Sequence, residues 1–240
     1  MLKIGTCYVC FKLMMSDQIL NVTNFLDLVS TPYRGEMNAV CWSRNLKGDF
    51  SEIVNKVVSN ENISTLTVEE LRDLPLSKEG ILARDVLVND LQALQDYGAS
   101  PMLNIIKSYD RDDAYPYFPT DVYSYHVDRS PVPTDTFLCT YFGASSELLP
   151  NTEVTQKILI PEIREELKKL YGGGEDGFED FLTEFFFDLH YQPKPAARSM
   201  RLGIGHLWKL AVDCPQSPVL PCVHRAPEET DGQSRLLLIC

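Results

Sequence analysis

The stretch from Asp121 to Gly143 reads DVYSYHVDRSPVPTDTFLCTYFG and decides the fold that we predict. Two runs rich in β-branched and aromatic residues, DVYSYHVD and TDTFLCTYFG, flank a break that contains proline and serine. Runs of this kind are typical of short β-strands joined by turns. Similar runs lie on either side: MLNIIKSY from Met102, GHLWKLAV from Gly205, VLPCVHRA from Val219 and RLLLIC from Arg235. Together they predict a barrel or sandwich of short strands.

The part of the chain before these runs differs in pattern, because residues 17–108 carry apolar side chains at helical spacing. The segment 49–58 predicts one helix, and Thr67 followed by Glu70 forms a capping-box pattern that starts another. The clearest predicted helix covers residues 81–97 and ends at Gly98. We therefore expect residues 1–108 to form a mainly helical layer packed on a strand domain of residues 109–240.

Residues 151–198 interrupt the series of predicted strands with helices of their own. Pro161 suits the first position of a helix, and Gly172 suits the position just after its end. The following segment, GFEDFLTEFFFDLHY from Gly177, predicts a second helix with an aromatic face. The run of three glycines from Gly172 lacks the Lys-Ser/Thr of a phosphate-binding loop, so we interpret it as a hinge. The sequence thus predicts an α+β fold with a helical insertion.

The charge balance disfavours nucleic acid as a partner. The chain has 34 acidic and 22 basic side chains, which give a net charge of −12. Such a charge repels a phosphate backbone unless lysine and arginine gather on one face, and no basic run occurs. No apolar run approaches the roughly 18 residues of a spanning helix, so we expect no membrane span.

The cysteine pattern favours free thiols in a cytoplasmic protein. The seven cysteines are odd in number and scattered along the chain, unlike a disulfide framework. Cys7 and Cys10 form a C-x-x-C pair, which can be half of a zinc site or a redox pair. No second C-x-x-C or H-x-x-x-H accompanies it, so a structural or incidental pair is favoured.

His126 and Asp128 form the pattern that points to chemistry. They lie two residues apart in a run that alternates like a strand, so both side chains should project from the same face. Two imidazoles and one carboxylate on one triangular face are a typical ligand set for Fe(II) that must keep other positions open. His224, in the later run VLPCVHRA, can supply the second imidazole.

Arg235 follows His224 by eleven residues and begins the last predicted strand. In a barrel, this offset can place its guanidinium at the far end of the cavity that holds the metal. A guanidinium binds a carboxylate through two parallel hydrogen bonds. A metal at one end and an arginine at the other suit a keto-dicarboxylate.

The order HVD, TFLCTYFG, GHLWKLAV, VHRAP and RLLLI resembles the Fe(II)/2-oxoglutarate-dependent dioxygenases of the double-stranded β-helix fold, a jelly-roll or cupin-like barrel. This resemblance covers residues from about 115 to 240, with a helical insertion lengthening the interval between Asp128 and His224. WSRNL from Trp42, SSELL from Ser145 and VHRAP with RLLLI are similar to a bacterial family known only as a domain of unknown function. That second resemblance covers most of the chain and brings no activity.

The dioxygenase resemblance implies His126, Asp128 and His224 as Fe(II) ligands and Arg235 as the partner of the 2-oxoglutarate carboxylate. Tyr125, Thr140 and Tyr141 are candidates, by neighbourhood alone, for a hydroxyl that assists the arginine. The implied function is an oxygenase or hydroxylase acting on a small molecule or a side chain. The alternatives are a cupin-like metal-binding protein without oxygenase activity and a non-catalytic interaction domain.

The two remaining histidines have plainer explanations. His190 is expected at the end of a helix, where a cation interacts favourably with the carbonyl end of the helix dipole. His206 precedes Leu207 in a predicted strand and could orient a metal ligand through a hydrogen bond.

Overall fold

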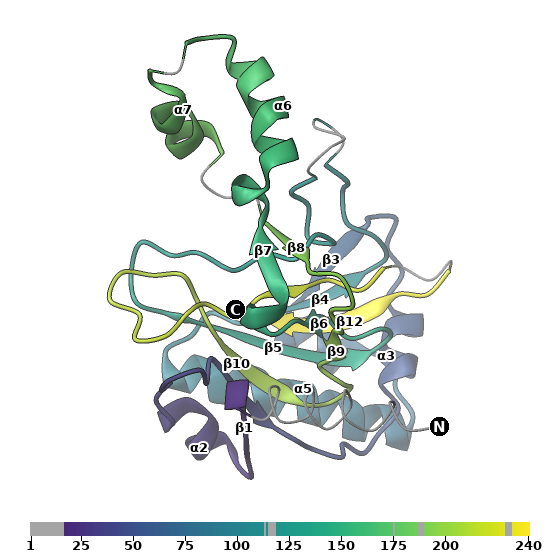
Figure 1. Ribbon diagram of the computed structural model, residues 1–240. Helices are drawn as coiled ribbons and strands as arrows, with labels where there is room; N and C mark the ends of the chain where they lie inside the picture. The colour runs from purple at the N-terminus through teal and green to yellow at the C-terminus, as the bar shows by residue number, and fades with distance from the viewer. Residues whose placement is uncertain (1–16, 113, 115–118, 175, 187–189, 229–231) are drawn as a thin grey trace, which may run out of the picture.

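A computed structural model describes residues 17–112, 114, 119–174, 176–186, 190–228 and 232–240. Its main feature is a seven-stranded sheet in the order β1-β2-β10-β5-β12-β4-β3 (Figure 1). Neighbouring strands are antiparallel except β1 and β2, which are parallel. The strands are β1 Ile19–Val22, β2 Ala39–Trp42, β3 Ile63–Leu66, β4 Met102–Ile106, β5 Asp135–Phe142, β10 Leu207–Ala211 and β12 Arg235–Ile239.

A smaller sheet has the order β11-β6-β9 and is built from two-residue strands: β6 Glu147–Leu148, β9 Met200–Arg201 and β11 His224–Arg225. An isolated antiparallel bridge between His126 and His224 adds residue 126 beside β11. The predicted run DVYSYHVD therefore pairs with β11 at the edge of the smaller sheet, but only through this single bridge. A separate two-stranded ribbon joins β7 Val154–Gln156 to β8 Tyr191–Pro193.

Four helices cover one face of the seven-stranded sheet: α2 Phe25–Ser30, α3 Phe50–Lys56, α4 Val68–Asp73 and α5 Lys78–Tyr97. Leu87 of α5 and Ile53 of α3 belong to the same buried cluster as Phe137 of β5. Leu138, the next residue of β5, instead packs with Leu148 of the smaller sheet. Successive side chains of a strand point to opposite faces, so β5 contributes to a helix-covered core and to a core between the sheets.

The insertion forms a separate unit that projects from the two sheets beyond β7 and β8 (Figure 1). The projecting part contains the short helix η2 Lys157–Leu159, then α6 Pro161–Tyr171 and α7 Phe178–Phe185, while η1 Asn151–Glu153 precedes β7 and is hydrogen-bonded to Asn38. Leu167 and Leu182 are buried in a cluster made of insertion residues. Pro161 begins α6 and Gly172 ends it in a left-handed conformation, as predicted.

The predicted α+β class is confirmed, and so are the helices that capping residues marked. Thr67 and Glu70 form a complete capping box at α4, and Gly98 ends α5 with a φ of 98°. The interpretation of residues 17–108 as a helical segment was wrong for β1, β2 and β3. Together with β4, these strands belong to the same sheet as β5, β10 and β12, so residues 1–108 share that sheet with residues 109–240.

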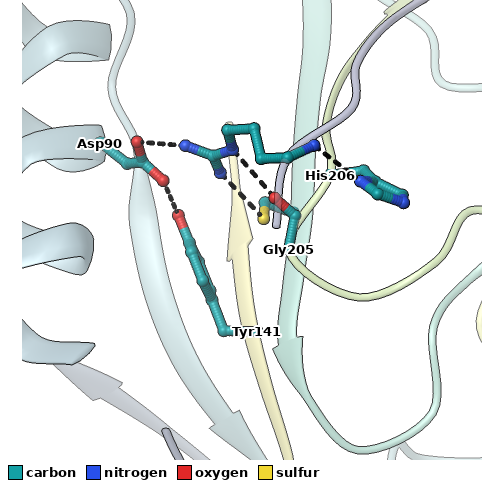
Figure 2. Close-up of polar contacts among 6 residues, drawn as sticks. Asp90, Tyr141, Gly205 and His206 are labelled. Atoms are coloured by element: carbon teal, nitrogen blue, oxygen red, sulfur yellow. Dashed lines mark hydrogen bonds and ion pairs between the residues drawn. The ribbon is translucent and has the colours of Figure 1, made fainter. Parts of the chain in front are cut away.

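A buried polar network joins α5 to the helix-covered face of the sheet (Figure 2). Arg44 pairs with Asp90 at 2.7 Å, and the Tyr141 hydroxyl donates a hydrogen bond of 2.6 Å to the other Asp90 oxygen. Arg44 also donates to the carbonyl of Gly205, which precedes β10. One carboxylate thus satisfies two buried groups from different parts of the chain.

We expect Asp90→Asn to lower the free energy of unfolding by about 1–3 kcal/mol, because the amide leaves the buried Arg44 without a negative charge. Urea unfolding measures this loss. Asp85→Asn on the same helix is a matched control, because its partner Arg84 and the carboxylate are more exposed and such pairs contribute little. Equal stability of the two variants would contradict a stabilising role for the network.

Candidate metal centre

His126, Asp128 and His224 come together at the edge of the smaller sheet, with one potential ligand atom of each within 4.8 Å of the others. The backbones of His126 and His224 exchange two hydrogen bonds of 2.9 Å, so these residues lie directly opposite each other. The backbone carbonyl of Asp128 accepts a hydrogen bond from Asp213 at 2.8 Å. Backbone pairing on neighbouring segments therefore places all three side chains.

A backbone carbonyl fixes the orientation of each imidazole through a hydrogen bond. Nδ1 of His126 donates to the carbonyl of Ser124 at 2.8 Å, and Nδ1 of His224 donates to the carbonyl of Cys222 at 3.2 Å. A carbonyl only accepts, so the proton of each neutral ring stays on Nδ1 and the Nε2 lone pair remains available. This is the usual support of a metal-binding histidine.

Asp128 supplies the only carboxylate of this group and is itself held by a hydroxyl. One of its oxygens lies 3.7 Å from Nε2 of His224 and accepts a hydrogen bond from Thr136 of β5. Burial and the neighbouring His224 imidazole lower the pKa of His126 below its ordinary range. A neutral imidazole is the form that binds a metal ion.

Arg235 lies on β12 and its side chain is enclosed, since the residue is 6% exposed. Its Nη2 donates to the hydroxyls of Thr140 at 3.0 Å and Ser146 at 2.7 Å. Its Nε is buried without a partner, and no carboxylate pairs with it in the part of the chain that the structure describes. Burial lowers the pKa of this guanidinium, but an arginine stays charged in proteins. A buried cation of this kind is poised to bind an anion.

The three candidate helpers of Arg235 have different positions. Thr140 contacts the guanidinium, as the prediction requires. The Tyr125 hydroxyl instead donates to Glu147 at 3.0 Å. Tyr141 was a wrong candidate, because it points to the opposite face of β5 and binds Asp90 (Figure 2). Ser146, which sequence reasoning missed, also accepts a hydrogen bond from Arg235.

Comparisons of the chain with protein-family models, with curated proteins and with solved structures found no match. Among the described residues, no helix is both long and apolar enough to cross a membrane. The five described cysteines, at positions 41, 139, 214, 222 and 240, are free; Cys7 and Cys10 lie outside the described residues. Geometry alone carries the interpretation of this site.

Both remaining histidines differ from expectation. His190 does not end a helix, since α7 stops at Phe185, and its ring lies 5.2 Å from that of His126. Burial and the His126 imidazole lower the pKa of His190 to about 3. His206 does not support a metal ligand; its Nδ1 accepts a hydrogen bond from the backbone of Arg44 at 3.0 Å (Figure 2).

Proposed function

We propose that this chain is an Fe(II)- and 2-oxoglutarate-dependent oxygenase with a double-stranded β-helix core, as the dioxygenase resemblance implies. The observation that carries the proposal is the pairing of two features on the inner faces of the sheets. One is the group of two imidazoles and one carboxylate. The other is the buried Arg235, which the hydroxyls of Thr140 and Ser146 contact and which no carboxylate neutralises among the described residues.

The strand pairing supports a double-stranded β-helix. Apart from the separate β7–β8 ribbon, the chain from β4 onward passes through β4, residue 126, β5, β6, β9, β10, β11 and β12. β6 pairs with β9, β5 with β10, residue 126 with residue 224, and β4 with β12, all antiparallel. This is the nested pairing of one long hairpin. Further pairing of β12 with β5 and of β11 with β6 is expected if that hairpin is wound into two facing sheets.

The donor set fits Fe(II). Two imidazoles and one carboxylate are borderline and hard ligands, without the thiolates that favour zinc or clusters. The closest described cysteine in sequence, Cys222, turns its backbone carbonyl to His224, and burial raises the pKa of its thiol. Three ligands from one side leave the remaining positions of an octahedral ion for other molecules.

We call His126, Asp128 and His224 the metal group. The spacing of residues along β5 fits a cosubstrate that reaches from this group to Arg235. Thr136 contacts Asp128 and Thr140 contacts Arg235. These residues are on the same face of β5 and lie about 13 Å apart along the strand. A five-carbon dicarboxylate with one contact at each end suits this span.

Each residue then has a physical task. When bound, the ion would provide coordination positions for 2-oxoglutarate and oxygen, and the decarboxylation of 2-oxoglutarate to succinate and carbon dioxide would supply two electrons to the oxygen. His126, His224 and Asp128 hold the ion, and the Thr136 hydroxyl fixes the Asp128 carboxylate. Arg235 binds the distal carboxylate in a charge-assisted contact. The apolar side chains between the sheets, including Leu138 and Leu237, exclude water.

Anaerobic titration of the Fe(II)-loaded protein with 2-oxoglutarate tests this function. We expect a weak visible charge-transfer band, because the keto and carboxylate oxygens chelate the metal. Glutarate, which has no keto group, should give no band. Absence of a band with 2-oxoglutarate, in protein shown by elemental analysis to contain iron, would count against the oxygenase.

A second candidate is a cupin-like metal-binding protein without oxygenase activity. The observation that favours it is the small cavity beside Arg235, whose lining includes none of His126, Asp128 and His224. A dicarboxylate that contacts both Arg235 and the metal needs a continuous space between them. This candidate predicts bound metal without the charge-transfer band and without succinate production.

A further inference from the structure

His190 occupies the base of the helical insertion, immediately before β8. Its backbone carbonyl accepts a hydrogen bond from Lys157 at 2.9 Å, and Tyr191 donates one to the carbonyl of Tyr125 at 2.8 Å. The backbone of His190 has a φ of 62°, the left-handed region that side chains other than glycine rarely adopt. Pairing on both sides therefore holds the residue beside His126 in a strained conformation.

The ring of His190 packs against the ring of His126, and one of its nitrogens lacks a hydrogen-bond partner among the described residues. Its centroid is 5.2 Å from that of His126, with 34° between the ring planes, while His126 and His224 are 4.7 Å apart. Nδ1 of His190 is buried and has no hydrogen-bond partner in the described part of the protein. A buried polar atom without a partner is unfavourable and calls for a functional explanation.

Direct ligation of the ion is not what this arrangement favours. The compact group of potential ligands consists of His126, Asp128 and His224, and His190 lies outside it. A histidine at this distance can instead contact a molecule bound to the ion. A divalent ion with one carboxylate and two neutral imidazoles keeps one net positive charge, so an anion is the favoured partner.

We propose that His190 hydrogen-bonds a small anion coordinated to the metal at His126, Asp128 and His224, so that the insertion completes the anion site. This inference rests on the metal site of the proposed function and applies equally to the oxygenase and to the cupin-like candidate. The anion class includes carboxylates, such as that next to a keto group. A purely structural His190 would only pack against the His126 ring.

The test uses Co(II)-loaded protein and azide as the anion probe, followed by visible absorption. His190→Phe keeps a planar ring and removes both nitrogens. His190→Asn suits the left-handed backbone better, because asparagine is enriched there, but its shorter amide does not reach as far. We expect both variants to bind azide roughly tenfold more weakly or worse, the usual effect of losing a hydrogen bond to a charged group, with unchanged Co(II) affinity.

His206→Asn is the matched control, because His206 contacts Arg44 and not the metal group; it should bind Co(II) and azide like the parent protein. Unchanged azide affinity in the His190 variants overturns the inference in favour of packing alone. A large fall in Co(II) affinity overturns it in favour of direct ligation. If the parent protein binds no Co(II), the metal site fails and the inference fails with it.

Discussion

Replacing His224 by alanine should weaken the binding of Fe(II) or Co(II) by more than about 100-fold, since even residues that only support ligands typically account for 10–100-fold. The variant keeps only His126 and Asp128 of the three donors. The Cys222 carbonyl would no longer have a ring to orient. Elemental analysis of protein purified without chelator, followed by Co(II) titration of the metal-free protein, measures the loss.

A buried histidine also fills space, so its replacement needs a control that creates a cavity without removing a ligand. Cys222→Ala serves this purpose, because the Cys222 side chain is buried two residues before His224 and packs between the sheets. We expect it to retain metal at the parent stoichiometry. If His224→Ala also retains parent affinity, the convergence of the three side chains has no role in metal binding.

Local signals in the sequence predict most of the helices and the longer strands. Capping residues fix helix ends through short-range hydrogen bonds, which is why α4 and α5 were anticipated at Thr67 and Gly98. β1, β2 and β3 have four residues each, too few to show a period, and they form only because a sheet edge is available. Their pairing is a property of the tertiary fold.

The candidate site likewise has a part that local sequence predicts and a part that depends on the tertiary fold. The two-residue spacing of His126 and Asp128 predicts a shared face, but the approach of His224 depends on a backbone pairing across 98 positions. Thr140 and Tyr141 are neighbours on β5, so at most one could face Arg235, and the sequence does not say which. His190 was wrongly expected at the end of a helix, because the register of β8 against residue 125, and no local motif, brings it beside His126.

Arg235→Met should change cosubstrate binding and stability in opposite directions. Loss of the charged contact should weaken 2-oxoglutarate binding to the Fe(II)-loaded protein by about 2–5 kcal/mol. Without ligand, the same change removes a buried charge that has no acidic partner among the described residues, so we expect the free energy of unfolding to rise by about 1–3 kcal/mol. The charge-transfer titration and urea unfolding measure the two effects.

Arg44→Met is the matched control, because Arg44 is also buried but pairs with Asp90 at 2.7 Å. Removing Arg44 leaves the buried Asp90 carboxylate without its cation, so this variant should have a lower free energy of unfolding than the parent. Its folded form should bind 2-oxoglutarate with unchanged affinity. The opposite signs follow from a single difference, the presence or absence of an acid beside the guanidinium. If Arg235→Met instead loses stability as Arg44→Met does and still binds 2-oxoglutarate, Arg235 is a structural residue and the cosubstrate assignment fails.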